Sequence, residues 1–178
     1  MILSDTDLRR RCWSGLVVAP GIYGENTDEY AAWEREHIQP ASVEVTLADT
    51  VIIPNPHTAS TKILNDRFEI GPNEFWLAST QETVNVPNDL IGFVHGKSSL
   101  ARKGLLVHIT AGLLDPGFSG QITLELKNVS HEPIELREGM PIAQLTFQTL
   151  TSPSERPYGS KGLGSHYQGQ VGTTESKV

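Results

Sequence analysis

Short apolar runs recur along this chain, most of them with a period of two, and glycine and proline separate them. Alternation of apolar and polar side chains is typical of a β-strand with one face in the core, and glycine and proline favour the turns between strands. The chain holds 16 glycines and 11 prolines. The apolar runs lie at residues 43–47, 51–53, 75–78, 91–94, 105–109, 122–126 and 142–147. These runs predict a mainly β fold, either a barrel or a double sheet.

The N-terminal part of the chain differs from this pattern. Ser4 is a candidate helix cap, and acidic and then basic residues follow it, which suits the helix dipole. A short helix is therefore predicted over about residues 4–14. Residues 28–36 are rich in alanine and glutamate, and they are either a second helix or part of an insert that leads to Gln39 and Pro40.

The C-terminal part also differs, because apolar periodicity stops after Leu150. A chain of 178 residues is long enough for one domain with a real core. We therefore expect a single domain over residues 1–150 and a tail over residues 151–178. Such a tail is either a frayed terminus or a flexible segment that orders over a ligand.

Charge and composition exclude several classes of protein. Lys plus Arg number 14 against 21 Asp plus Glu, and the resulting net charge of −7 argues against a protein that neutralises a nucleic-acid backbone. Cys12 is the sole cysteine, so neither a disulfide framework nor a cysteine-based zinc site is expected. The mean hydropathy is −0.24, and the sequence has no long apolar run and no signal peptide. A cytoplasmic protein without a membrane span is expected.

A basic and hydroxyl-rich segment between two apolar runs is a candidate phosphate-binding site. It contains Gly96, Lys97, Ser98, Ser99 and Arg102. A glycine lets backbone N–H groups approach an anion, hydroxyl groups donate hydrogen bonds, and arginine donates from a planar fork. The spacing is that of neither a Walker loop nor a nucleophile elbow, which excludes an ATPase and a hydrolase with a catalytic triad. The alternative is a solvated turn and short helix.

Glu125 is the most informative acidic residue. In the run Ile122-Thr-Leu-Glu-Leu the three aliphatic side chains share one face of a strand, so Thr123 and Glu125 share the other. If both faces are covered, Glu125 lies in a cleft and carries protons in both directions near neutral pH. If the face is open, Glu125 is an ordinary acid on a solvated strand.

Two other sets of residues are candidates for chemistry. Asp115 lies within the glycine-rich turn at residues 110–120, where it is either ordinary turn chemistry or a group that fixes a sugar hydroxyl or a water. The six histidines show no metal-ligand spacing, and the His-x-Glu and Pro-Cys-x-x-Cys signature of zinc deaminases is absent. A zinc site is therefore not expected.

Taken together and in this order, several motifs resemble the dCTP deaminase family of the dUTPase-like superfamily. They are Gln39-Pro-Ala-Ser-Val-Glu-Val, Gly96-Lys-Ser-Ser-Leu-Ala-Arg, Thr110-Ala-Gly-Leu-Leu-Asp-Pro-Gly-Phe-Ser-Gly, Ile122-Thr-Leu-Glu-Leu, Ile142-Ala-Gln-Leu, Ser152-Pro-Ser-Glu-Arg-Pro-Tyr-Gly and Tyr167-Gln-Gly-Gln. The resemblance covers nearly the whole chain. It implies a β-clip subunit, a homotrimer with active sites at the subunit interfaces, and a C-terminal tail that closes over each site as a lid.

The resemblance also implies roles for individual residues. Glu125 matches the catalytic acid–base residue of a zinc-free hydrolytic deamination, Ser98 and Arg102 match residues that position the water and the glutamate, and the backbone carbonyl of Ala111 matches a water contact. The substrate is a nucleotide triphosphate that carries Mg²⁺, with no direct metal ligand from the protein. The other positions that match nucleotide contacts are Lys97, Ser99, Asp115, Thr123, Gln144, Tyr158, His166 and Gln170.

Three positions bear on which reaction is completed. Glu44 stands where the family usually has aspartate, and His166 stands where it usually has lysine, unless Lys161 substitutes. Gly112 follows Ala111, as in family members that convert dCTP to dUMP and pyrophosphate, and in that case Asp115 also orients the water that attacks the α-phosphate. A dUMP-forming enzyme, which supplies dUMP for dTTP synthesis, is therefore expected. The alternatives are a deaminase that releases dUTP, a dUTPase and a non-catalytic nucleotide-binding regulator.

Overall fold

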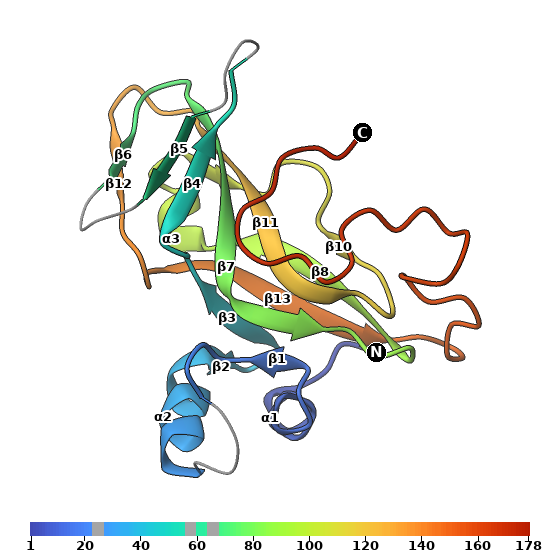
Figure 1. Cartoon of the computed structure of the whole chain (residues 1–178). Helices are drawn as coiled ribbons and strands as arrows, with labels where there is room; N and C mark the ends of the chain where they lie inside the picture. Colours follow the sequence, from blue (N-terminus) through green and yellow to red (C-terminus); the bar gives the residue numbers. More distant parts are fainter. Residues whose placement is uncertain (23–26, 56–59, 64–67) are drawn as a thin grey trace.

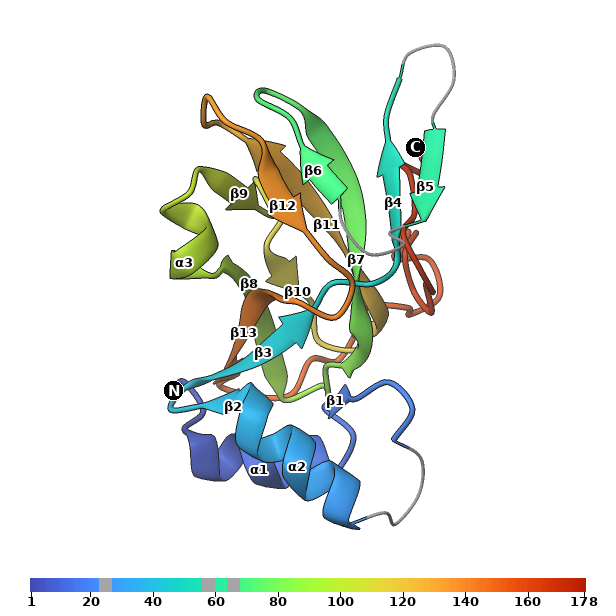
Figure 2. The same ribbon diagram turned by 90° about the vertical axis from the view of Figure 1, so that its left-hand side faces the viewer.

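Strands dominate the computed structural model, which describes residues 1–22, 27–55, 60–63 and 68–178. Two sheets pack face to face, and two helices lie together at one end of them (Figures 1 and 2). The mainly β fold expected from the alternating runs is confirmed. None of the helices in these residues is long and apolar enough to cross a membrane.

The two main sheets differ in their strands but share one core. The first sheet contains β5 (Ser60–Ile63), β4 (Thr50–Ile53), β7 (Phe75–Asn85), β11 (Ser119–Asn128) and β9 (Leu105–Val107) in this spatial order, and β1 (Val17–Val18) also pairs with β7. The second sheet contains β10 (Leu113–Leu114), β8 (Leu90–Gly96), β13 (Pro141–Thr149), β3 (Ser42–Thr46) and β2 (Ile38–Gln39). A small separate sheet pairs β12 (Ile134–Leu136) with β6 (Phe68–Ile70).

Alternate residues of the long strands form the core between the sheets. The burial of β11 alternates strictly along its length, as its sequence predicted. Removal of each such large apolar side chain from water stabilises the fold by roughly 1.5–3 kcal/mol. The largest side chains that are almost fully buried are Leu8, Leu47, Ile70, Trp76, Leu90, Leu105, Leu124, Leu126, Leu136, Ile142 and Phe147.

The N-terminal helices cover the end of the sheets near β1 and β2 (Figure 2). Helix α1 (Asp5–Trp13) confirms the helix expected over residues 4–14, and it buries Leu8 and Cys12, which lie one turn apart. Burial raises the pKa of the Cys12 thiol to about 12, so this thiol is kept neutral and unreactive. Helix α2 (Thr27–His37) confirms the helical reading of residues 28–36.

A β-bulge in β7 adjusts the pairing between β7 and β11. The register shifts between Gln121 and Thr123 of β11. The hydroxyl of Thr80 bonds to the backbone at the bulge. Its Oγ1 accepts a hydrogen bond from the N–H of Ile122 at 3.0 Å and donates one to the carbonyl of Glu82 at 2.9 Å. The polar groups freed by the bulge are therefore satisfied, and pairing continues on both sides of it.

Glu82 is a fully buried carboxyl that joins the two sheets. Its two oxygens lie 2.9 Å from the backbone nitrogen of Thr46 and 2.8 Å from the Thr46 hydroxyl, which also lies 2.9 Å from Oε1 of Gln81. Burial raises the pKa of Glu82, against the opposing effects of the Thr46 donors and the charge of His37. A protonated Glu82 fits these contacts, because it can donate to the Thr46 hydroxyl while that hydroxyl donates to Gln81.

We expect Glu82→Gln to weaken the pH dependence of stability. Because the pKa of Glu82 is raised above 4.5 on folding, the folded state keeps a proton that the unfolded chain releases. The associated stabilisation is complete below that pH and is lost as the pH rises through the folded-state pKa, at no more than about 1.4 kcal/mol per pH unit. Urea unfolding of both proteins between about pH 5 and 8, at one protein concentration, measures the difference.

The exposed Glu132 provides the matched control for this experiment. Glu132→Gln should keep the wild-type slope of unfolding free energy against pH. An equal slope in the wild type and in Glu82→Gln would contradict a protonated Glu82.

Candidate active site

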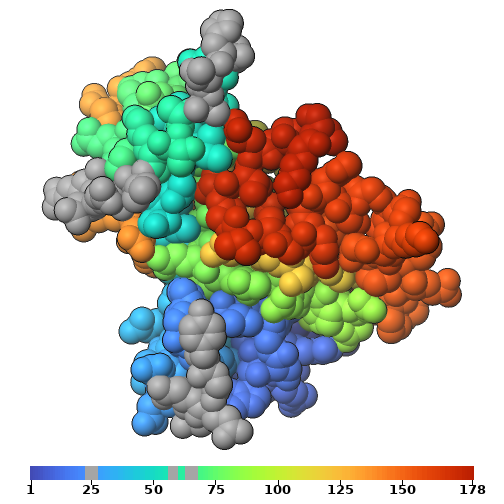
Figure 3. Space-filling view, in the orientation of Figure 1, coloured from blue at the N-terminus to red at the C-terminus, as the bar shows by residue number. Residues whose placement is uncertain are grey.

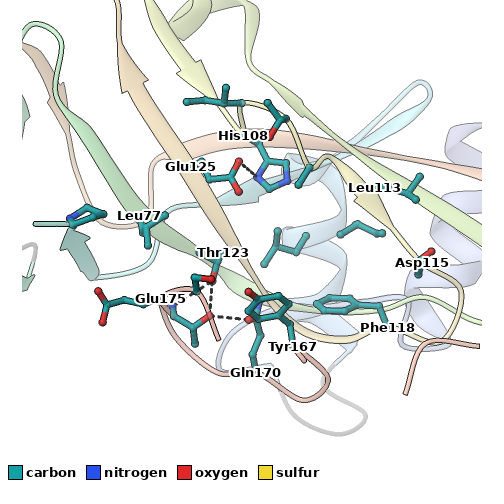
Figure 4. Close-up of a pocket in the computed structure, with 18 of the residues that line it drawn as sticks. Leu77, His108, Leu113, Asp115, Phe118, Thr123, Glu125, Tyr167, Gln170 and Glu175 are labelled. Carbon is teal, nitrogen blue, oxygen red and sulfur yellow. Dashed lines mark hydrogen bonds and ion pairs between the residues drawn. The ribbon is translucent and has the colours of Figure 1, made fainter. Parts of the chain in front are cut away.

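A cavity of about 940 Å³ lies on the outer face of β11. The strand β11, the segment of residues 108–118 and the tail enclose it, as the close-up in Figure 4 shows. Its volume is in the range of small-molecule sites. The lining residues are Pro54, Phe75, Leu77, His108, Ile109, Thr110, Ala111, Leu113, Leu114, Asp115, Phe118, Ile122, Thr123, Glu125, Tyr158, Tyr167, Gln170, Thr174, Glu175 and Ser176.

Glu125 and Thr123 reach the cavity from the same face of β11, as the alternation of the sequence predicted. The Glu125 side chain is 28% exposed, and its Oε2 atom is buried without a hydrogen-bond partner. Thr123 shares a hydrogen bond of 3.2 Å with Thr174 of the tail. A carboxyl group therefore lies on one wall of the cavity with part of its bonding capacity unused.

The segment after β9 forms a second wall. Strand β9 ends at Val107, two residues earlier than the apolar run suggested, because His108 adopts a positive φ of 64°. The chain then passes Ala111 and reaches Asp115, whose carbonyl accepts the N–H of Phe118 at 3.0 Å. Asp115 therefore forms a turn contact and also lines the cavity, and its role there stays a prediction.

The tail contains neither a helix nor a strand, yet it packs closely against β11 and the turn before it (Figures 1 and 3). Gln170 forms a parallel bridge with Gly120, and its side-chain amide donates to the carbonyl of Gln121 at 2.6 Å. The hydroxyl of Thr173 donates to the carbonyl of Thr50 at 2.7 Å. Tyr158 packs its ring 6.0 Å from that of Phe118. The tail thus covers one side of the cavity.

The basic segment lies outside this cavity. Ser98 and Ser99 begin the short helix α3 (Ser98–Ala101), and their side chains are exposed, as is that of Arg102. Lys97 forms an ion pair with Glu44, and Gln144 donates to the same oxygen at 3.3 Å. None of these residues lines the cavity.

The expected site residues therefore fall into three places in the single chain. Ala111, Asp115, Thr123, Glu125, Tyr158 and Gln170 line the cavity, and Lys97, Ser98, Ser99, Arg102 and Gln144 lie around α3 and β13. His166 is exposed on the tail and lines no part of the cavity, and Lys161 is exposed as well.

The charges of the two groups are complementary. The described lining of the cavity contains three carboxylates, those of Asp115, Glu125 and Glu175, and neither lysine nor arginine. Among the described residues, no three histidine, cysteine, aspartate or glutamate side chains lie close enough together to hold a metal ion. The cavity of one chain thus presents acid–base and hydrogen-bonding groups, while the cations of the expected site lie elsewhere.

Sequence reasoning missed several lining residues, of which His108 is the most consequential. Its side chain is only 6% exposed, and its Nδ1 lies 3.7 Å from Oε2 of Glu125. The spacing of His108 was weighed only for metal binding, and nothing in an apolar run ending in Val-His-Ile reveals that the chain turns back at that point. Tyr167, Thr174 and Glu175 of the tail also line the cavity, although they were not among the expected site residues.

Comparison with known proteins identifies the family. The dCTP deaminase-like family model matches residues 2–150, and the chain belongs to this family, as its motifs predicted. A Bifidobacterium animalis subsp. lactis protein named "dCTP deaminase, dUMP-forming" is 43% identical over 193 residues, which cover 99% of this chain and 94% of that protein. Proteins with the same name from Mycobacterium ulcerans and Thermobifida fusca are 45% and 44% identical, cover 99% of this chain, and match over 95% and 92% of their own lengths.

A solved structure supports the fold. The 2'-deoxycytidine 5'-triphosphate deaminase from Agrobacterium tumefaciens superposes with a TM-score of 0.66 at 18% sequence identity. The match covers 84% of this chain and 48% of that protein, so this chain spans about half its length. The chain therefore shares the fold of that protein, and this fold is mainly β, as the sequence predicted.

We expect Gly117→Ala to loosen the tail. Gly117 has a φ of +90°, and a Cβ there would lie 2.6 Å from Cβ of Pro157. Gly139 also has a positive φ, of +71°, but nothing lies within 4 Å of its added Cβ. Both alanine variants thus carry the backbone cost of about 1 kcal/mol, and only Gly117→Ala adds a clash with the tail.

Limited proteolysis of the tail measures this difference. An overpacking clash of about 1–3 kcal/mol should speed cleavage within residues 151–178 by roughly fivefold or more relative to Gly139→Ala. Equal cleavage rates in the two variants would show that the tail does not depend on this contact.

Proposed function

We propose that this protein is a dUMP-forming dCTP deaminase. The observation that carries this proposal is the identity of 43–45%, over nearly the whole length of both chains, to proteins with that name. The geometry of the cavity supports it, because Glu125 projects into a space large enough for a nucleoside, beside Thr123 and the turn that carries Ala111. Hydrolytic deamination needs one group that can take a proton from water and return it.

In the proposed deamination, Glu125 takes a proton from the water that attacks C4 of cytosine. The same carboxyl group then gives a proton to N3 of the ring and assists the departure of ammonia. Ala111 lines the same cavity, and its carbonyl is proposed to accept a hydrogen bond from the attacking water. Ser98 and Arg102 are proposed to hold the water and the carboxylate in position.

In the proposed second step, Asp115 orients a water for attack on the α-phosphorus, and pyrophosphate leaves. The absence of a side chain at Gly112 supports this step. A Cβ there would lie 3.1 Å from the carbonyl oxygen of Val94, which is closer than an ordinary van der Waals contact. A larger residue would have to shift this turn, and with it the water site beside Asp115.

We further propose that Mg²⁺ enters with the triphosphate. The carboxylate of Glu44 is engaged by Lys97 and Gln144, so it suits a contact through water better than direct ligation. The phosphate oxygens are then the main ligands of the ion. When bound, Mg²⁺ neutralises the charge that develops on the leaving pyrophosphate.

The separation of charges favours active sites formed between subunits of a homotrimer. A triphosphate is strongly anionic, and the cavity of one chain presents three carboxylates without a lysine or arginine in its described lining. Arg102 and Lys97 lie on and beside α3, outside that cavity. A neighbouring copy of the chain can supply its α3 segment to the cavity, which brings Ser98 and Arg102 to Glu125. In this arrangement residues 151–178 act as the lid over each site.

We expect a time course with dCTP and Mg²⁺ to yield dUMP and pyrophosphate without accumulation of free dUTP. Chromatographic separation of the nucleotides measures each product. Stoichiometric dUTP, together with no hydrolysis of added dUTP, would instead identify a monofunctional deaminase. Hydrolysis of dUTP with dCTP left intact would identify a dUTPase, and binding without turnover a nucleotide-binding regulator.

Glu125→Gln should abolish deamination while it leaves nucleotide binding intact. The amide retains the volume and hydrogen bonding of the side chain, but it cannot accept and return a proton. The turnover of dCTP should fall below roughly a tenth of the wild-type kcat, whereas dCTP binding measured by calorimetry should persist. A variant with greater residual turnover would exclude Glu125 as the acid–base group.

Mixing two inactive variants tests whether sites form between subunits. Arg102→Ala and Glu125→Gln should each be nearly inactive as pure trimers. If they are unfolded and refolded together in equal amounts, roughly a quarter of the interface sites combine an intact Arg102 with an intact Glu125. Recovery of deamination supports a shared site, whereas a mixture as inactive as its components contradicts it.

A further inference from the structure

The Nδ1 atom of His108 and the Oε2 atom of Glu125 are both buried and both lack a hydrogen-bond partner. They lie 3.7 Å apart and face each other on the wall of the cavity, as Figure 4 shows. This distance exceeds that of a hydrogen bond by less than 1 Å. Buried polar atoms are rarely left unsatisfied, and a catalytic role is one explanation for an exception.

The backbone brings these two residues together. Val107 pairs with Leu126 at the end of the β9–β11 ladder, and the N–H of His108 donates to the carbonyl of Glu125 at 2.8 Å. The two residues are therefore direct neighbours across adjacent strands. A small rotation of either side chain is enough to bring Nδ1 and Oε2 into contact without movement of the sheet.

The conformation of His108 is a costly one for a histidine. Its φ of 64° lies in the left-handed region, which is uncommon for residues other than glycine, although asparagine, aspartate and histidine adopt it more often than the rest. Backbone strain of this kind persists where the surrounding structure holds it, and it is found most often at active sites and ligand clamps. His108 is thus unusual in two respects: its backbone has a positive φ, and Nδ1 of its ring lacks a hydrogen-bond partner.

We propose that His108 is the positioning residue of Glu125 in deamination. When substrate fills the cavity, Nδ1–H donates to Oε2 and fixes the plane of the carboxylate. The second oxygen, Oε1, is then held ready to receive the proton of the attacking water. His108 itself exchanges no proton with the substrate. This inference rests on the proposed function, because it concerns the step that Glu125 performs.

The space around the imidazole is compatible with this movement. A Cβ at Gly112 would lie 3.7 Å from Cδ2 of His108, so the glycine leaves the ring free on that side. The other ionisable groups that line the cavity are Asp115, Tyr158, Tyr167 and Glu175. In the described structure, neither these groups nor any other forms a hydrogen bond with Nδ1 of His108 or Oε2 of Glu125. These two atoms can therefore bond to each other.

Three substitutions at residue 108 separate positioning from packing. His108→Gly removes the ring and relieves the backbone, so the protein should still fold. His108→Asn tolerates the positive φ and puts an amide N–H close to the place of Nδ1. His108→Gln puts its amide near the place of Nε2, farther along the side chain. Only the asparagine variant keeps a donor that can reach Oε2.

We expect a selective loss of turnover in steady-state assays with dCTP and Mg²⁺. In His108→Gly the kcat for deamination should fall by about 10- to 100-fold, while the KM for dCTP changes by less than about threefold. His108→Asn should recover most of the lost kcat, and His108→Gln should not. His131→Asn is the matched control, because His131 is exposed in the turn after β11 and lines no part of the cavity. It should behave as the wild type.

The results that overturn the inference are distinct from those that overturn the proposed function. A wild-type protein that leaves dCTP intact contradicts the proposed function, and the role of His108 falls with it. With an active wild type, an unchanged kcat in His108→Gly contradicts the inference alone. Equal activity of the asparagine and glutamine variants, or a loss that appears in KM instead of kcat, identifies a packing role and also overturns it.

Discussion

The pairing of β11 with β7 is the interaction on which the rest of the structure depends. It determines which side chains of β11 enter the core and which face the cavity. A shift of one residue would bury Glu125 and expose Leu124, because successive side chains of a strand point to opposite faces. The bulge at Thr80 accommodates extra residues of β7 opposite β11. Residues 123–127 of β11 therefore keep the register that directs Glu125 toward the cavity. Backbone hydrogen bonds between β7 and β11 thus determine which side chains face the cavity.

Much of this arrangement is predictable from the sequence, because alternation reports directly on a half-buried strand. The faces of Thr123 and Glu125 follow from the run Ile122-Thr-Leu-Glu-Leu alone. The early end of β9 does not follow from the sequence, because the positive φ of His108 depends on tertiary contacts that an alternating apolar run does not encode. The close packing of the tail could not be predicted either, because its composition suits a frayed end as well as a packed one. The separation of α3 from the cavity depends on packing between distant segments, which local spacing does not describe.

The same separation is the basis of our proposal that a single chain is an incomplete binding site for a triphosphate. Asp115, Glu125 and Glu175 bring three carboxyl groups to the lining of the cavity, and ionised carboxyl groups repel phosphate. Lys97 is already paired with Glu44, so its charge is partly compensated within its own chain. Arg102 is the more available cation, because its side chain is exposed and a guanidinium remains charged in any environment. A site completed by Arg102 of another copy would make nucleotide binding depend on assembly.

Two carboxyl groups in this fold illustrate how burial separates structural from chemical roles. Glu82 is fully buried, which raises its pKa, and its contacts with the backbone and hydroxyl of Thr46 hold the sheets together. Glu125 is partly exposed, and its buried oxygen is left without a donor beside an imidazole in a strained conformation. A group whose hydrogen bonds are complete has little to gain from a ligand. A group with an unused bond and a neighbour within reach gains that bond when the cavity is filled and water is excluded, which favours the reactive arrangement in the bound state over the free one.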